Sequence, residues 1–82
     1  MSSPFRYRVN ESHGARGSTG HGGASVYAEA REIARELSIR EPNRDKTFRI
    51  FGLDMEIVGV ALNGKITNRD GTGPDVDPDA KH

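Results

Sequence analysis

The sequence predicts an α+β fold, in which one helix packs on one face of a small mixed β-sheet of about four strands. Three observations support this prediction. Apolar residues alternate with polar ones in short segments, as in half-buried strands, and they recur at helical spacing in a single longer segment. An Asn-Gly pair near the end marks a tight hairpin. The expected order along the chain is β-α-β-β-β.

The first expected strand is Pro4–Val9, where apolar residues alternate with two arginines. Its apolar members are Phe5, Tyr7 and Val9, and its arginines are Arg6 and Arg8. This period of two is typical of a strand with one buried face.

Residues 10–23 have a different composition. Five of the ten glycines fall between Gly14 and Gly23, and no apolar residue larger than Ala15 occurs there. Such a segment buries too little apolar surface to offset its ordering entropy, so a flexible loop is expected. A glycine loop before a helix also suits a phosphate, because free N–H groups and the helix dipole attract anions. The side chains that would assist are Arg16, Ser18, Thr19 and His21.

The glycine spacing does not match the dinucleotide fingerprint, since Ser25 stands where the third glycine is required. The alternative interpretation of residues 10–23 is therefore a flexible surface loop without a ligand.

The helix is expected over Ala24–Ile39, with Ser25 as its N-cap. Its apolar residues form one stripe on a 3.6-residue period and are Val26, Ala30, Ile33, Ala34 and Leu37. The helix is expected to end by about Arg40, because Pro42 disfavours helical angles in the residue before it.

Three further strands are expected, and they are Lys46–Phe51, Met55–Leu62 and Lys65–Asn68. The nearly continuous apolar run of Met55–Leu62 suits a central strand covered on both faces. Asn63-Gly64 predicts a type I′ turn into the last strand. Residues 1–68 would then form one domain, and residues 69–82 an acidic disordered tail.

Composition sets the expected class of protein. The chain has 82 residues, 33% of them hydrophobic, no cysteine and a formal net charge of zero. A lean core of this size favours pairing with a partner or a second copy. The absence of cysteine, of a signal-peptide pattern and of a membrane-spanning apolar run leads us to expect a soluble, cytoplasmic protein with no membrane contact.

The arginines give the second candidate site. Arg6, Arg8 and Arg49 are expected on the face of the sheet away from the helix, together with Phe51. A cationic sheet face with an exposed aromatic ring can hold single-stranded nucleic acid through phosphate contacts and base stacking. The alternative is a solvated outer face on which arginine stems cover apolar surface.

Other site types find little support in the sequence. Residues 59–65 match a phosphate-loop motif only until Ile66 replaces its Ser or Thr, and a helix is not expected to follow. His13 and His21 lack a third firm metal ligand, so neither a metal nor any other cofactor is expected. No spacing suggests a catalytic set, so the chain is not expected to be an enzyme.

The sequence leaves two functional interpretations. The first is a small non-enzymatic binding or adaptor protein that acts through protein–protein contact with a partner or with itself as a homodimer, because uncovered edge strands tend to pair. The alternative is a nucleic-acid or phosphate-ligand binder that uses the arginine face and the glycine-rich segment. The third interpretation is an enzyme in which residues 10–23 form an active-site lid.

Overall fold

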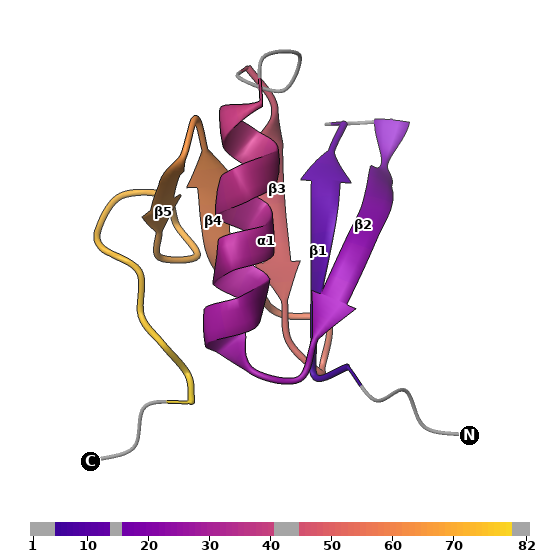
Figure 1. Cartoon of the computed structure of the whole chain (residues 1–82), viewed down its shortest axis with the longest axis vertical. Coiled ribbons are helices and arrows are strands. Elements are labelled where there is room, and N and C mark those ends of the chain that lie inside the picture. The colour runs from indigo at the N-terminus through magenta and orange to yellow at the C-terminus, as the bar shows by residue number, and fades with distance from the viewer. Residues whose placement is uncertain (1–4, 14–15, 41–44, 80–82) are drawn as a thin grey trace.

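A computed structural model describes residues 5–13, 16–40 and 45–79 of the chain. One helix packs against a five-stranded sheet (Figure 1), which confirms the predicted α+β class. The helix is α1 (Tyr27–Ile39), and the strands are β1 (Tyr7–Ser12), β2 (Ser18–Ala24), β3 (Thr47–Phe51), β4 (Ile57–Leu62) and β5 (Lys65–Thr67).

The strands lie in the order β2-β1-β3-β4-β5, and every neighbouring pair is antiparallel. The prediction of a mixed sheet is therefore wrong. The helix joins β2 to β3, and these two strands run in the same direction because both are antiparallel to β1 between them. The expected helical crossover exists, but the strands that it joins are not neighbours. The expected central strand is also displaced, because β3 holds the middle position.

The glycine-rich segment forms an additional strand, β2, which was not expected from the sequence. Most of residues 10–23 belongs to the end of β1 and to β2, so the loop interpretation is wrong there. Backbone pairing with β1 orders this edge strand without apolar side chains of its own, and a bulge at His21 shifts the register between Val9 and Asn10. Strand β1 correspondingly starts at Tyr7 and continues to Ser12, beyond the expected end at Val9.

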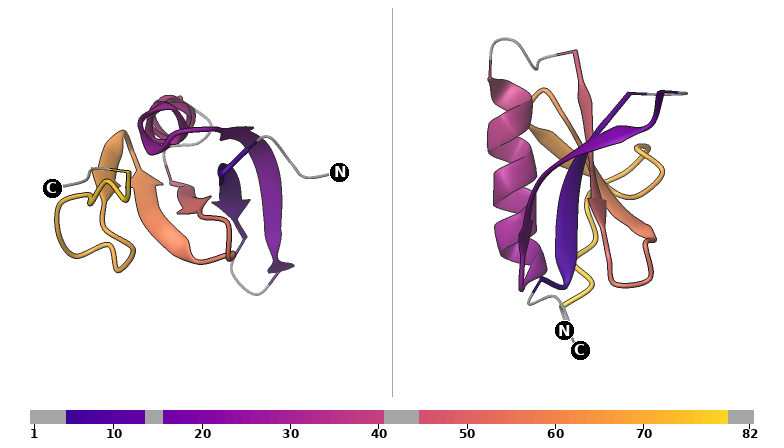
Figure 2. Two further views of the ribbon diagram at one scale, coloured as in Figure 1. Left: turned by 90° about the horizontal axis from the view of Figure 1, so that it is seen from below. Right: turned by 90° about the vertical axis from the view of Figure 1, so that its right-hand side faces the viewer.

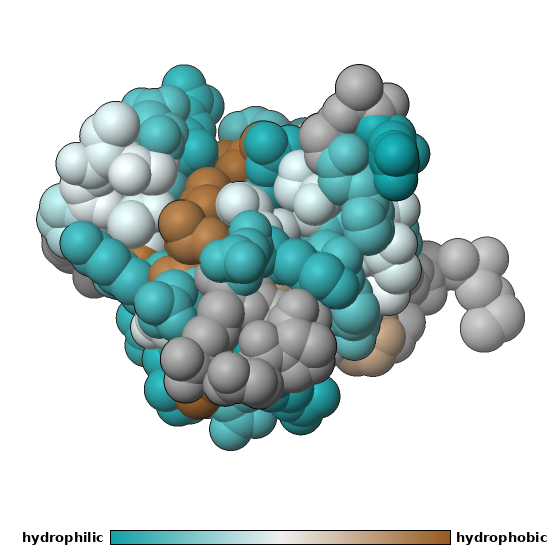
Figure 3. Space-filling view, turned by 90° about the horizontal axis from the view of Figure 1, so that it is seen from above, coloured by the Kyte–Doolittle hydropathy of each residue, from teal (hydrophilic) through white to brown (hydrophobic). Residues whose placement is uncertain are grey.

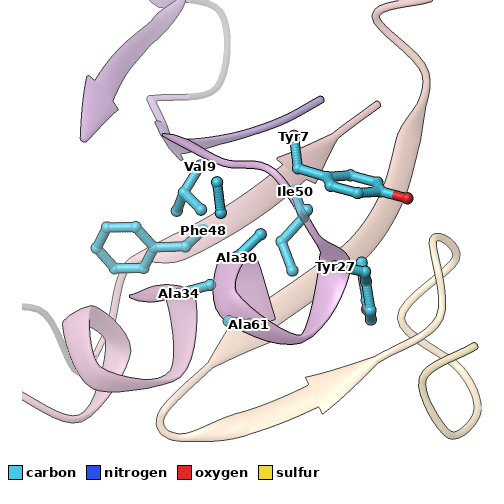
Figure 4. Close-up of a cluster of buried hydrophobic side chains, with 9 residues drawn as sticks. Tyr7, Val9, Tyr27, Ala30, Ala34, Phe48, Ile50 and Ala61 are labelled. Carbon is cyan, nitrogen blue, oxygen red and sulfur yellow. The ribbon is translucent and has the colours of Figure 1, made fainter. Parts of the chain in front are cut away.

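The core lies between α1 and the sheet. Figure 4 shows side chains from β1, β3 and β4 meeting those of the helix. The buried apolar residues are Tyr7, Val9, Ala24, Tyr27, Ala30, Ala34, Phe48, Ile50 and Ala61. Alanines on the helix let it approach the sheet closely, so that a small chain still buries Phe48 and Ile50 completely.

The buried stripe of the helix is rotated from the expected one. Ala30 and Ala34 are buried as predicted, but Val26 is 41% exposed while Tyr27 and Ser38 are buried. The helix starts at Tyr27 and not at Ala24, because β2 extends through Ala24. Val26 occupies the N-cap position and makes no capping hydrogen bond through its side chain.

The hairpin between β4 and β5 confirms the predicted turn. Asn63 and Gly64 have φ angles of 51° and 82°, as a type I′ turn requires. The Gly64 N–H donates to Ser38 Oγ at 2.7 Å, which ties this turn to the last turn of α1. The buried serine therefore has a structural role that the sequence pattern does not show.

Residues 69–79 follow a defined path, although the composition predicts disorder for residues 69–82. Pro74 forms a bridge with Thr67 of β5, and the chain then returns to the start of α1 (Figure 1). There Asp75 pairs with Arg31 at 3.0 Å, and Asp79 Oδ2 accepts a hydrogen bond from the Tyr27 N–H at 2.8 Å. The tail thus supplies the N-cap that Val26 cannot provide.

Candidate functional site

The helix covers one face of the sheet and leaves the other uncovered. Figure 2 shows α1 standing on one side, and the described chain places no second helix on the opposite side. Residues on a strand alternate between faces, so the neighbours of core residues point away from α1. We call this surface the open face, and its strand residues are Arg8, Asn10, Ser12, Thr47, Arg49, Phe51, Val60, Leu62, Lys65 and Thr67.

Three of the residues predicted for the cationic face meet on this surface. Arg8 lies directly across from Phe51, and Arg49 lies across from Asn10 on the same pair of strands. Both arginines are exposed, and Phe51 is half-buried. Arg8 and Arg49 are therefore diagonal neighbours with an aromatic ring beside them, as the alternation predicts.

Arg6 does not join them. It precedes β1, and its guanidinium lies 5.8 Å from the centre of the Tyr7 ring and 3.6 Å from Asp79 Oδ1. This arginine therefore belongs with the tail contacts at the start of α1. The two-residue period fails for Arg6 because that residue lies outside the strand.

Every charged residue at the described strand positions of the open face is a cation. The face carries Arg8, Arg49 and Lys65, and none of its described strand positions holds Asp or Glu. These three cations form no ion pair within the described chain, whereas Arg6, Arg31 and Lys46 each contact a carboxylate elsewhere. A chain with no net charge therefore presents a local positive surface here.

A pocket is lined in part by Lys65 of the open face. It has a volume of about 320 Å³ and is lined by Thr47, Val60, Leu62, Lys65, Thr67 and Gly71. Leu62 is 46% exposed beside it. Sequence reasoning missed this pocket because it assigned Leu62 to a strand covered on both faces. The Asn63-Gly64 turn was a usable signal, since it pairs Leu62 with Lys65 and so places both on one face.

The end of the molecule where α1 terminates is also partly apolar. Figure 3 looks onto this end and shows apolar side chains in a band between hydrophilic ones. Ile39 closes the helix and is 44% exposed, and Leu62 closes β4. The apolar part of the open face thus reaches the end of the sheet.

The predicted ligand residue His21 lies with a buried carboxylate instead. Its Nε2 is 2.9 Å from Glu11 Oε1, and its ring meets Phe48 edge-on with centroids 5.5 Å apart. Lys46 Nζ and His13 Nε2 lie 3.3 and 3.6 Å from Glu11 Oε2. The Glu11 side chain is only 8% exposed. The hydrogen bond from His21 and then the ammonium of Lys46 hold the pKa of Glu11 below its ordinary value, against the opposing effect of burial.

This cluster explains how a glycine-rich strand is held. Glu11 belongs to β1, His13 follows that strand, His21 belongs to β2, and Lys46 precedes β3, so the contacts of Glu11 hold β2 against the sheet. Glu11 is the common partner of the other three residues, and the arrangement is a structural one. The contact between Glu11 and Lys46 could not be predicted from their spacing in the sequence.

The remaining predicted anion ligands lie away from the helix start. Arg16 is exposed between β1 and β2, Ser18 Oγ accepts a 3.4 Å hydrogen bond from Asn10, and Thr19 Oγ1 is 2.7 Å from His13 Nε2. These residues sit at one end of β2, and α1 begins after the other end. The structure does not bring them together with the helix N-terminus, where Asp79 already accepts the Tyr27 N–H.

Two tyrosines lie near this end of the helix. Tyr7 donates its hydroxyl hydrogen to Asp79 Oδ1 at 2.7 Å, and burial together with Asp79 raises its pKa to about 12. Burial and the charge of Asp75 raise the pKa of Tyr27 to about 12 as well. The Tyr27 hydroxyl is buried without a hydrogen-bond partner among the described residues. Both phenols stay protonated at neutral pH, so neither supplies a base there.

Two other features of the described chain bear on its class. Across residues 5–13, 16–40 and 45–79, no group of three or more His, Asp or Glu residues is arranged to hold a metal ion. The same ranges contain no helix with the length and apolar character needed to cross a membrane.

Comparison of the chain with protein-family models, with curated proteins and with solved structures finds no match.

Proposed function

We propose that this chain is a small non-enzymatic binding or adaptor protein that acts through protein–protein contact at the open face. The observation that supports this most is the asymmetry of the sheet. One face is sealed by α1, while the other presents Phe51, Val60 and Leu62 beside Arg8, Arg49 and Lys65, which form no ion pair within the described chain. A surface that mixes apolar and arginine side chains is typical of protein interfaces.

The polar clusters support a non-enzymatic role. Glu11 contacts His13, His21 and Lys46, and Asp79 caps the helix. These groups stabilise the fold through the contacts that they make. On the open face, by contrast, Arg8, Arg49 and Lys65 form no ion pair within the described chain, which leaves these cations available for recognition.

A homodimer would be a second form of protein contact, and it would use the edge of the sheet. Strand β2 lies at the edge of the sheet, whereas the opposite edge strand, β5, bonds to Pro74. Pairing of two β2 strands would join two sheets without using the open face. Sedimentation velocity over a wide concentration range distinguishes this dimer from a monomer that binds another protein.

A photoreactive residue tests the proposed contact. Leu62 and, as a matched control, Glu36 on the outer side of α1 are exposed, so either position accepts the probe without loss of the core. In the native host, we expect irradiation to give covalent protein adducts with the probe at Leu62 and few at Glu36. Equal yields at both positions, together with a strict monomer in sedimentation, would contradict the proposal.

The second candidate is a nucleic-acid or phosphate ligand, and the pairing of Arg8 with Phe51 beside Arg49 favours it. Two phosphate contacts would give a logarithmic salt slope of about −1.4 for a single strand. We expect replacement of Arg8 and Arg49 by Ala to abolish that slope. Oligonucleotides that show no affinity even at low salt would exclude this candidate.

A further inference from the structure

We infer that the open face binds an acidic polypeptide segment that carries aliphatic side chains. This inference rests on the proposed function and adds the chemistry of the partner. It follows from three features that lie together on one surface, namely cations without an ion pair in the described chain, a pocket with an apolar side, and the absence of carboxylates from the described strand positions of that face.

The cations define the charge of the partner. Arg8 of β1 and Arg49 of β3 are exposed and are diagonal neighbours. Lys65 of β5 lies across from Leu62 of β4. The three charges therefore span four adjoining strands of the sheet, from β1 to β5. Since none of them has a carboxylate partner in the described chain, an acidic segment laid across the face would supply the missing partners.

The pocket defines the apolar part of the partner. Val60 and Leu62 form its apolar side, and Lys65 stands at the same site. A volume of about 320 Å³ is enough for an aliphatic side chain, with a neighbouring carboxylate in reach of the ammonium. A segment in which acidic and aliphatic residues alternate presents both groups at this spacing.

Electrostatics disfavours a second copy as the occupant. A twofold interface places the same patch of both molecules together. Arg8, Arg49 and Lys65 would then face the same three cations without any described carboxylate between them. Self-association through the open face is therefore unfavourable, and a homodimer would have to use the edge of β2.

The apolar chemistry disfavours nucleic acid. Stacking of successive bases requires exposed aromatic rings, and among the described strand positions of the open face Phe51 is the one aromatic residue and is half-buried. The rest of the apolar surface is aliphatic, from Val60 and Leu62. Such side chains fit the aliphatic residues of a peptide better than they fit bases.

Selection from a random dodecapeptide display library on the immobilised full chain tests the inference. We expect the selected peptides to be enriched in Asp and Glu together with Leu, Ile and Val. Their binding should weaken about tenfold in Arg49→Glu and in Lys65→Glu, and it should weaken as salt rises from about 0.05 M to about 0.5 M. The control Arg40→Glu changes an exposed charge at the end of α1 and should leave the affinity unchanged.

The outcomes separate the inference from the proposed function. Selected peptides that bind the open face without acidic enrichment would overturn the inference and leave protein contact at this face supported. If no peptide competes at the open face while a labelled oligo-dT binds and loses affinity in Arg49→Glu, both are overturned. Peptide binding that is equal in wild type, Arg49→Glu and Lys65→Glu overturns the inference, and the two variants guard against a folding defect in either one.

Discussion

The two faces of the sheet follow different physical rules, although the same strands supply both. On the covered face, Phe48 and Ile50 are fully buried and Glu11 contacts His21 and Lys46. Along β3, Arg49 and Phe51 alternate with Phe48 and Ile50 and lie on the open face, where Arg49 is exposed and Phe51 is half-buried. Packing against α1 accounts for the residue types of the covered face.

The same explanation does not extend to the open face. Folding does not require that three cations gather where the described strand positions carry no carboxylate, since like charges repel. Nor does folding require that Leu62 be left 46% exposed. Packing therefore does not explain the residue types of the open face, whereas the proposed binding role would account for them.

The largest expected difference between the faces is in the free energy of unfolding that is lost when a phenylalanine of β3 is replaced. Replacing the buried Phe48 by Ala should lower the free energy of unfolding by about 3–5 kcal/mol, because it leaves a cavity beneath α1. Replacing the half-buried Phe51 should cost well under half of that. Urea unfolding of both variants measures the difference, and equal losses would break the distinction between the faces.

Two glycines provide a second comparison. A methyl group on Gly59 would lie 2.5 Å from the Tyr27 hydroxyl oxygen, whereas one on Gly20 would meet only Asn10 Oδ1, at 3.7 Å. Gly59→Ala should therefore destabilise the fold by about 1–3 kcal/mol through overpacking, and Gly20→Ala should not. Thermal unfolding of the two variants checks this expectation.

A double-mutant cycle identifies the cause of that loss. Tyr27→Phe removes a buried hydroxyl that has no partner among the described residues, so by itself it should be neutral or stabilising by about 1 kcal/mol. In the Tyr27→Phe background, Gly59→Ala should cost less than in the wild type. Simple additivity would show that the hydroxyl is not the obstacle.

The tail contact at the edge of the covered face should have a smaller effect. Asp79→Ala removes the acceptor of the Tyr27 N–H and of the Tyr7 hydroxyl. We expect a loss of about 1 kcal/mol, typical of an N-cap, and a lower Tyr7 pKa in a spectrophotometric titration. The control Asp70→Ala alters an exposed tail carboxylate and should change neither quantity. An unchanged Tyr7 pKa in Asp79→Ala would mean that the tail does not dock.

The smallest effect at neutral pH is expected for Glu11→Gln, because glutamine keeps the volume and an acceptor for His21. The pH dependence should differ more. The folded-state pKa of Glu11 lies below 4.5, so its stabilisation is complete above that pH and is lost as the pH falls through the folded-state value. The stability difference between wild type and Glu11→Gln should therefore shrink in acid. Glu36→Gln serves as an exposed control, and parallel acid profiles for all three proteins would contradict this prediction.

Local patterns were sufficient for several elements. Alternation along Thr47–Phe51 and the helical spacing of Ala30 and Ala34 predicted a strand and a helix that the structure contains. Positive φ angles at Asn63 and Gly64 followed from their residue types alone. The shared face of Arg8 and Arg49 was also predictable, because the period of a strand is a local property.

Strand β2 and the path of residues 69–79 depend on tertiary contacts. Residues 18–24 become a strand because β1 offers backbone partners and His21 reaches Glu11, and neither partner is visible in a glycine-rich composition. Residues 69–79 dock because their carboxylates meet Arg31 and the start of α1, which lie more than forty positions away in the sequence. Local periods and turns can therefore be predicted from neighbouring residues, whereas strand pairing, sheet order and the apolar surface that stays open depend on contacts between distant segments.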